Sequence, residues 1–214
     1  INKIAEISNR QEIKLIHIST DYIFDGISEK AYLESDDPSP LNIYGKSKLA
    51  GEVAVCAAMQ KNAIIIRTSW LYSEHSNNFV DTILRKAQKF DELNVISDQF
   101  SSPTNASDLA KVIIQIINHN KFRNHNQLTQ IYHYSGHGVC SWFEFAREIL
   151  KLANIDSQVN PIEAKCYLSA ARRPKYSFLN TDKIAKDFDL EIPFWKDSLK
   201  VSIDNLLEIN KPVS

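Results

Sequence analysis

Three residues whose side chains could together reduce or oxidise a carbonyl group lie in one short stretch. Tyr44 and Lys48 are four positions apart in YGKSK, and Thr20 directly follows the apolar run KLIHIS. A tyrosine phenol has an unperturbed pKa of about 10, and a lysine ammonium on the adjacent helical turn favours the phenolate. Such a tyrosine can donate a proton to a carbonyl oxygen during reduction. A threonine hydroxyl can hydrogen-bond the same oxygen and fix the carbonyl for hydride attack.

A Tyr-x-x-x-Lys spacing taken alone is weak evidence, because most such pairs are solvated residues on a helix surface. Here the pair lies between two strand-like runs. The run before it, residues 14–19, ends directly before Thr20, and the run after it, residues 63–68, is closely followed by Trp70. Ligand sites of open α/β sheets lie beyond the carboxyl ends of the strands. This context favours the catalytic interpretation of the pair.

The elements that must position these residues alternate along the chain. Short apolar runs predict strands at residues 14–19, 63–68, 94–97, 131–135 and 158–163. Apolar residues at spacings of three and four predict helices at residues 1–9, 41–60, 77–90, 181–188 and 195–209, with two more after Thr104 and Ser141. This alternation predicts an α/β fold with a largely parallel sheet.

The helix predicted at residues 41–60 carries the tyrosine and the lysine. We expect it to bury an apolar seam of Leu49, Val53, Cys56 and Ala57. Gly45 and Gly51 are poor helix formers, at a cost of about 1 kcal/mol each, so a close approach of a backbone or ligand is expected there. Helix N-caps are predicted at Thr104 or Ser107, at Ser141 in a capping box with Glu144, and at Thr181.

The composition argues against several classes of protein. The 214 residues carry a formal net charge of −1, which leaves no electrostatic footprint for nucleic acid or an anionic membrane. No apolar run approaches the roughly 18 residues of a membrane span, and no secretory signal is recognised. Three widely spaced cysteines, Cys56, Cys140 and Cys166, predict buried thiols in a reduced, cytoplasmic protein. No cysteine or histidine spacing resembles a metal-binding motif, so no metal ligands are predicted.

Longer stretches of the chain resemble the dTDP-4-dehydrorhamnose reductase family of extended short-chain dehydrogenases/reductases. The matching stretches are HISTDYIFDG, SPLNIYGKSKLAGE, RTSWLYSEHSNNFV, ISDQFSSPT and ARRPKYSFLNTDKI. They occur in the family's order and cover nearly the whole chain. The resemblance implies a Rossmann-like parallel sheet with a smaller C-terminal α/β substrate-binding region. It also implies reduction of the 4-keto group of dTDP-4-dehydro-β-L-rhamnose by NADPH or NADH to dTDP-L-rhamnose, for bacterial cell-surface polysaccharide.

The resemblance also implies roles for single residues. Tyr44, Lys48 and Thr20 fall on the family's catalytic positions, and Ser19, Tyr44 and Lys48 would contact the cofactor. The implied substrate contacts are Thr20, Asp21, Tyr22, Trp70, Asn78, Gln99, Thr104, Arg172 and Arg173. Trp70 would face the sugar, although a core tryptophan after a strand is the plainer interpretation. One of the two arginines would bind the diphosphate, since a guanidinium matches phosphate geometry; a surface ion pair is the alternative for either.

One feature of the family has no counterpart here. Members begin with a strand and a Gly-x-x-Gly-x-x-Gly turn, which binds the cofactor's pyrophosphate at a helix N-terminus. The chain has five glycines, and none forms such a turn. It therefore resembles about the C-terminal two-thirds of a member, and we expect little or no activity from it alone. Residues 1–135 are expected to be the C-terminal part of the NAD(P)-binding domain, with a substrate-facing insertion near residues 72–105. Residues 136–214 are expected to be mainly substrate-binding.

Several alternatives stay open from the sequence. A non-catalytic, dinucleotide-binding regulatory subunit of the methionine adenosyltransferase type is one, and a related sugar-nucleotide ketoreductase or epimerase is another. The residue that selects NADPH or NADH has no counterpart in the chain. Some family members bind Mg²⁺ between subunits, so Mg²⁺ and a homodimer are further candidates implied by the resemblance.

Overall fold

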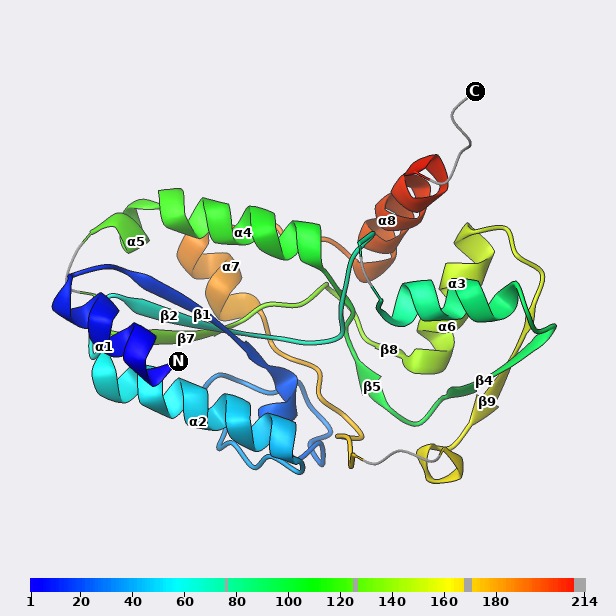
Figure 1. The fold of residues 1–214 in the computed structure, drawn as a ribbon, viewed down its shortest axis with the longest axis horizontal. Helices are drawn as coiled ribbons and strands as arrows, with labels where there is room; N and C mark the ends of the chain where they lie inside the picture. Colours follow the sequence, from blue (N-terminus) through cyan, green and yellow to red (C-terminus); the bar gives the residue numbers. More distant parts are fainter. Residues whose placement is uncertain (76, 125–126, 168–170, 210–214) are drawn as a thin grey trace.

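A computed structural model describes residues 1–75, 77–124, 127–167 and 171–209 (Figure 1). A three-stranded sheet has the order β1-β2-β7 and consists of β1 (Leu15–Thr20), β2 (Ala63–Thr68) and β7 (Gln130–His133). All pairs are parallel, and Thr20 lies opposite Thr68 in the register. The predicted α/β fold with a parallel sheet is confirmed, and the carboxyl ends of β1 and β2 meet at one edge.

Helices cover both faces of this sheet (Figure 1). On one face lie α1 (Asn2–Arg10) and α2 (Ile43–Ala58), which pack on Ala63 and Ile65. On the other face lie α4 (Ala106–Asn118) and α7 (Asp182–Phe188), which pack on Ile64 and Ile66. Successive β2 side chains therefore enter different cores, and this explains why a continuous apolar run forms the central strand.

A second group of elements lies beyond the carboxyl ends of the sheet strands (Figure 1). In it β4 (Glu92–Ile96) pairs in parallel with β9 (Gln158–Ile162). The helices α3 (Phe79–Ala87), α6 (Trp142–Leu152) and α8 (Trp195–Ile209) share one apolar core with this pair. The connecting elements are the helical turns η1 (Asp21–Ile23) and η2 (Ala164–Cys166), the short helix α5 (Asn120–Arg123), and the strands β3 (Leu71–Tyr72), β5 (Phe100–Ser101), β6 (Thr104–Asn105) and β8 (Cys140–Ser141).

Of the apolar seam expected on α2, Leu49 packs against the cluster of Ile23 and Phe24, but the other three residues are exposed. Val53 is 60% exposed and Cys56 is also exposed, whereas Gly45, Gly51, Glu52 and Val55 are the buried residues of the helix. The helix is turned this way because the Glu52 carboxylate meets the buried guanidinium of Arg67. An ion pair between a helix and a strand cannot be predicted from the spacing of apolar residues along the helix alone.

Three further sequence expectations need correction. Cys56 and Cys166 are exposed, so only Cys140 is a buried thiol. The N-cap of α4 is Asn105, whose Oδ1 accepts from the N–H groups of Ser107 and Asp108, and not Thr104 or Ser107. Thr181 stands at the N-cap position of α7 without a side-chain cap bond. The capping box of Ser141 and Glu144 is confirmed.

Some expectations stay untested. The division at residue 135 stays a prediction, although α7, which follows it, packs on the sheet. The loop expected at residues 167–179 includes residues 168–170, which lie outside the described part. Within the described part, none of the helices has both the length and the apolar character needed to cross a membrane.

Candidate active site

The predicted trio comes together at the carboxyl end of β1. Thr20 is the last residue of that strand and is 6% exposed, and α2 brings Tyr44 and Lys48 over it on successive turns. The Lys48 ammonium donates a hydrogen bond of 3.0 Å to the carbonyl oxygen of Ile18. Asn42 caps α2, because its Oδ1 accepts from the N–H of Gly45 at 2.8 Å. The Tyr44 side chain is 52% exposed and so is accessible to a substrate.

Gly45 explains how closely α2 approaches the turn after β1. A Cβ atom at Gly45 would lie 2.2 Å from the carbonyl oxygen of Tyr22, closer than any side chain allows. This contact places the Tyr22 and Tyr44 rings edge to face, with centroids 5.9 Å apart. The close backbone approach expected at this glycine is confirmed. Gly51 differs, since a Cβ there would meet His17 and Ile1 at ordinary distances from 3.4 Å.

We expect Gly45→Ala to lower the free energy of unfolding by about 1–3 kcal/mol, because the added methyl group must push α2 away from Tyr22. The same shift moves Tyr44, so the catalytic rate falls with it. Gly51→Ala is the matched control on the same helix. It should be neutral or stabilising, by up to about 1 kcal/mol, because alanine favours the helix. Urea unfolding of both variants checks this, and equal effects of the two would contradict it.

Asp21 lies beneath the trio and is 1% exposed. The Thr20 hydroxyl donates to its Oδ1 at 3.1 Å, and the Ser177 hydroxyl donates to its Oδ2 at 2.5 Å. Burial raises the pKa of the Asp21 carboxyl to about 7, against the opposing effect of these hydrogen bonds. Asp21 therefore joins the end of β1 to the segment that carries the two arginines.

Tyr22 stands between the trio and that arginine segment. Burial raises the pKa of its phenol to about 12, with a further contribution from the charge of Asp21, while Arg173 acts in the opposite direction. Asn42 donates to the main-chain oxygen of Arg172 at 2.9 Å, so the cap of α2 also contacts this segment. Tyr22 therefore keeps its proton at neutral pH and can serve as a hydrogen-bond donor.

Two adjoining grooves open beside this point. The smaller, of about 480 Å³, is lined by Ile96, Gln99, Ala164, Lys165, Tyr167, Ala171, Arg172 and Arg173. The larger, of about 690 Å³, has Lys86 and aromatic residues of α3 and α6 in its wall. Ile96, Tyr167 and Arg173 line both grooves. A cationic, partly aromatic groove next to a proton donor fits an anionic ligand that carries a planar base.

The other predicted substrate residues lie at different depths. Asn78 caps α3, accepting from Val80 N–H at 2.9 Å, and α3 forms a wall of the larger groove. Trp70 stacks on Trp142 with ring centroids 3.5 Å apart, and its φ of 44° is unusual for a residue other than glycine. Thr104 is 1% exposed and is hydrogen-bonded to Thr68. The substrate roles of these residues remain predictions.

The chain is similar in sequence to a known family of proteins. Residues 1–208 match the family model described as the RmlD substrate binding domain. A dTDP-4-dehydrorhamnose reductase from Sinorhizobium fredii is 38% identical over 204 residues, which are 94% of this chain and 69% of that protein.

The chain belongs to the dTDP-4-dehydrorhamnose reductase family.

Solved structures of the reductase family have the same fold. One from Clostridium acetobutylicum superimposes with a TM-score of 0.89 at 36% identity, covering 96% of this chain and 70% of that one. Another, from Bacillus anthracis in complex with NADP, gives 0.86 at 38% identity, covering 95% and 69%. The chain thus spans about two thirds of the length of these relatives. Their names do not favour the regulatory-subunit alternative.

The reductase family implies a nicotinamide cofactor, and the residues present fit its nicotinamide end. Within the described residues, the buried Ser19 hydroxyl has no hydrogen-bond partner, so it is available to a ligand. Lys48 and Tyr44 lie at the end of the same strand. For Mg²⁺ the described residues give no support, since they contain no cluster of three or more His, Cys, Asp or Glu side chains that could hold a metal.

Sequence reasoning missed several residues of this reductase site. Trp142 follows a capping serine like any first-turn residue, and nothing in its spacing marks it as the stacking partner of Trp70. Ser177 contacts Asp21 across 156 positions. Glu52 does stand four residues after Lys48, at helical spacing, and this was the one available signal of a shared face.

Proposed function

We propose that this chain carries the proton-donating and sugar-nucleotide-binding parts of an NAD(P)H-dependent reductase of dTDP-4-dehydro-β-L-rhamnose, with dTDP-L-rhamnose as product. The observation that carries the proposal is the meeting of Tyr44, Lys48 and Thr20 beside a groove lined by two arginines. The family membership reported above supports the same reaction.

When bound, the reduced nicotinamide supplies a hydride to the sugar's carbonyl carbon. The chain's own residues act on the oxygen. Tyr44 protonates it, and the fixed charge of Lys48 favours the phenolate left behind. Thr20 hydrogen-bonds the oxygen and orients the carbonyl when its single hydroxyl proton turns from Asp21 Oδ1 to the substrate, while the N–H of Tyr22 still donates to the Thr20 hydroxyl oxygen.

Spectrophotometric NADPH and NADH oxidation with dTDP-4-dehydrorhamnose tests this function in the natural gene product that carries the chain. Turnover with this sugar, and formation of dTDP-L-rhamnose, is the expected result. Cofactor oxidation that is unchanged when the sugar nucleotide is left out would contradict it. Comparing the two cofactors at equal concentration decides their order of preference.

Arg173 is the residue we assign to the diphosphate, because it lines both grooves and its charge acts on Tyr22. Arg173→Met should raise KM for the sugar nucleotide about 10- to 100-fold, the loss expected for charge-assisted hydrogen bonds to phosphate. Arg172→Met is the matched control and should change KM less than about threefold. Steady-state kinetics and dTDP inhibition constants measure both, and the reverse order would assign the diphosphate to Arg172.

A further inference from the structure

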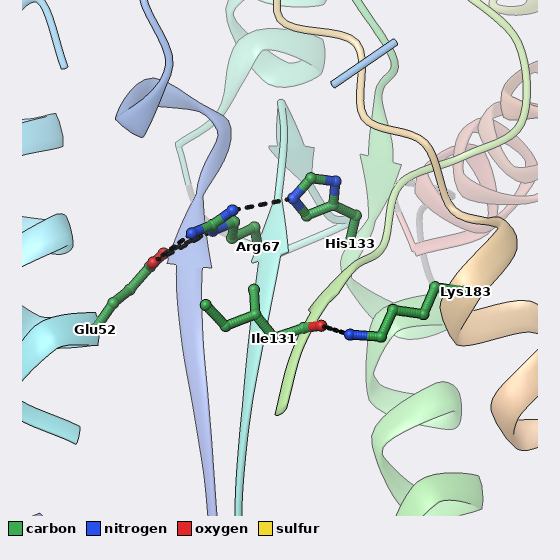
Figure 2. A network of polar contacts seen from close by, with 5 residues as sticks. All are labelled: Glu52, Arg67, Ile131, His133 and Lys183. Carbon is green, nitrogen blue, oxygen red and sulfur yellow. Dashed lines mark hydrogen bonds and ion pairs between the residues drawn. The ribbon is translucent and has the colours of Figure 1, made fainter. Parts of the chain in front are cut away.

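A buried ion pair joins the catalytic helix to the central strand. Arg67, on β2, and Glu52, on α2, are each 2% exposed. The Arg67 guanidinium donates from Nε to both carboxylate oxygens, at 3.0 and 3.2 Å, and from Nη2 to Oε2 at 2.8 Å. Figure 2 shows this pair with His133 on its other side. The arrangement is bidentate, so it fixes both distance and direction.

His133 extends the pair without adding charge. Burial and the neighbouring guanidinium lower the pKa of its imidazole to about 3, so the ring is neutral. Its Nδ1 lies 3.1 Å from the carbonyl oxygen of Tyr32 and must therefore carry the proton. Nε2 is left as the acceptor for Arg67 Nη1 at 3.4 Å (Figure 2). The three side chains together hold one positive and one negative charge.

The contact of Gly45 with Tyr22 sets how near the start of α2 lies to the turn after β1, but the apolar packing of the helix is sparse. Of its four buried residues two are glycines, one is Glu52, and only Val55 brings a sizeable apolar side chain. Apolar contacts have no preferred direction, and a helix can slide or turn against them at small cost. A bidentate ion pair has one geometry, and register is the best-attested use of buried charges. Stability alone does not explain the pair, because apolar replacements are often as stable.

The position of α2 decides where the proposed catalytic groups lie. Tyr44, Lys48 and Glu52 follow one another at intervals of one turn, so they move as one body. Arg67 lies opposite Ser19 in the sheet register, one residue before the pair of Thr20 and Thr68. The ion pair is therefore anchored directly behind the strand end at which the trio meets.

We propose that Glu52 and Arg67 are positioning residues of the proposed reductase: their ion pair fixes the setting of α2, and so of Tyr44 and Lys48, without placing a net charge behind them. This inference rests on the proposed function. The effect of the pair on the position of α2 and its effect on the local charge can be separated with variants.

Glu52→Gln removes the carboxylate that pairs with Arg67. The other charged or titratable groups that face the pair are Glu34, which accepts from the His133 N–H at 3.0 Å, and His17, beside Lys48 and Glu52; both stay in every variant. We expect kcat to fall about 10- to 100-fold, as for a catalytic group displaced by about 1 Å. The pH at which the rate falls on the basic side should drop by about one unit, because an added positive charge favours the phenolate. In Glu52→Gln/Arg67→Met neither charge of the ion pair remains. The pH at which the rate falls on the basic side should therefore return to the wild-type value, while kcat stays low. Glu52→Asp keeps the charge and should leave the pH unchanged.

A labelling experiment gives the same information without turnover. Acylation of Lys48, measured by mass spectrometry against the exposed Lys46 of the same helix, should become faster in Glu52→Gln, because a nearby cation favours the neutral amine. It should return to the wild-type rate in the double variant. If the wild-type gene product reduces no sugar nucleotide but labelling follows this pattern, the proposed function fails and the assigned charge balance stands.

Ile116→Ala, in the core on the opposite face of the sheet, is the stability control. If the ion pair only stabilised the fold, Glu52→Gln would behave like Ile116→Ala. The rate would fall only in proportion to the unfolded fraction of the protein. The pH at which the rate falls on the basic side and the labelling rate of Lys48 would both stay unchanged. That result in Glu52→Gln would overturn the proposal. The double variant answers the question even if Glu52→Gln does not fold, since a well-folded double variant with wild-type kcat would overturn it equally.

Discussion

Tyr44→Phe should lower kcat about 100- to 10,000-fold and change KM for the sugar nucleotide less than about threefold. The substitution removes one hydroxyl, from the half-exposed ring at the mouth of the site. Without it the phenol proton proposed for the carbonyl oxygen is lost, whereas Lys48, the grooves and their arginines are untouched. A loss confined to kcat identifies a group that acts in the transition state and not in binding.

Tyr132→Phe is the matched control for this prediction. Tyr132 lies away from the site, on the side of the sheet where α7 packs. Its hydroxyl donates to the Asp187 carboxylate, at 2.8 Å from Oδ2. The kcat of Tyr132→Phe should stay within about twofold of the wild-type value, because the Tyr132 hydroxyl is not aimed at the charge that develops in the transition state. If Tyr44→Phe kept most of its activity and Tyr22→Phe lost it, the proton donor would be Tyr22 instead.

Asp21→Asn should remove a loss of stability that the wild type shows as pH rises from about 5 to 8. The Asp21 carboxyl has its pKa raised from 3.8 to about 7 in the folded protein. Well below pH 3.8 the Asp21 carboxyl is protonated in both the folded and the unfolded protein, so its ionisation does not change the free energy of unfolding. Between the two values the unfolded chain gives up its proton first, so the folded state binds more protons and stability falls with pH. Above about 7 the full cost, about 4 kcal/mol, is present.

Urea unfolding at pH 5 and pH 8 measures this effect. Between these two values the wild type should lose about 2.5 kcal/mol more than Asp21→Asn, whose amide cannot ionise. The comparison cancels every other group that titrates equally in both proteins. Ser177→Ala removes a hydrogen bond that holds the pKa of Asp21 down, so that pKa should rise further and the pH dependence should persist and grow. Equal pH dependence in the wild type and Asp21→Asn would show that Asp21 ionises as easily in the folded state as in the unfolded chain.

Much of the architecture was predictable because its causes are local. The run AIIIRT predicted β2 at residues 63–68, and the structure has the same bounds, since a strand buried on both faces must be apolar throughout. The capping box of Ser141 and Glu144 followed from a spacing of three residues. The Tyr44 and Lys48 pair followed from helical spacing, and the matching family stretches imply the chemistry that we propose for it.

The sequence by itself therefore determined the five longer strands, most of the helices, the family and the candidate residues for the chemistry. Only the tertiary structure decided which way α2 faces, that Asp21 lies beneath the site, and that Arg173 lines both grooves. The physical reason is the same in each case. A helical or strand period reports which residues share a face, but the partner that buries that face comes from elsewhere in the chain. Glu52 meets Arg67, and Asp21 meets Ser177, only when the sheet has brought these segments together.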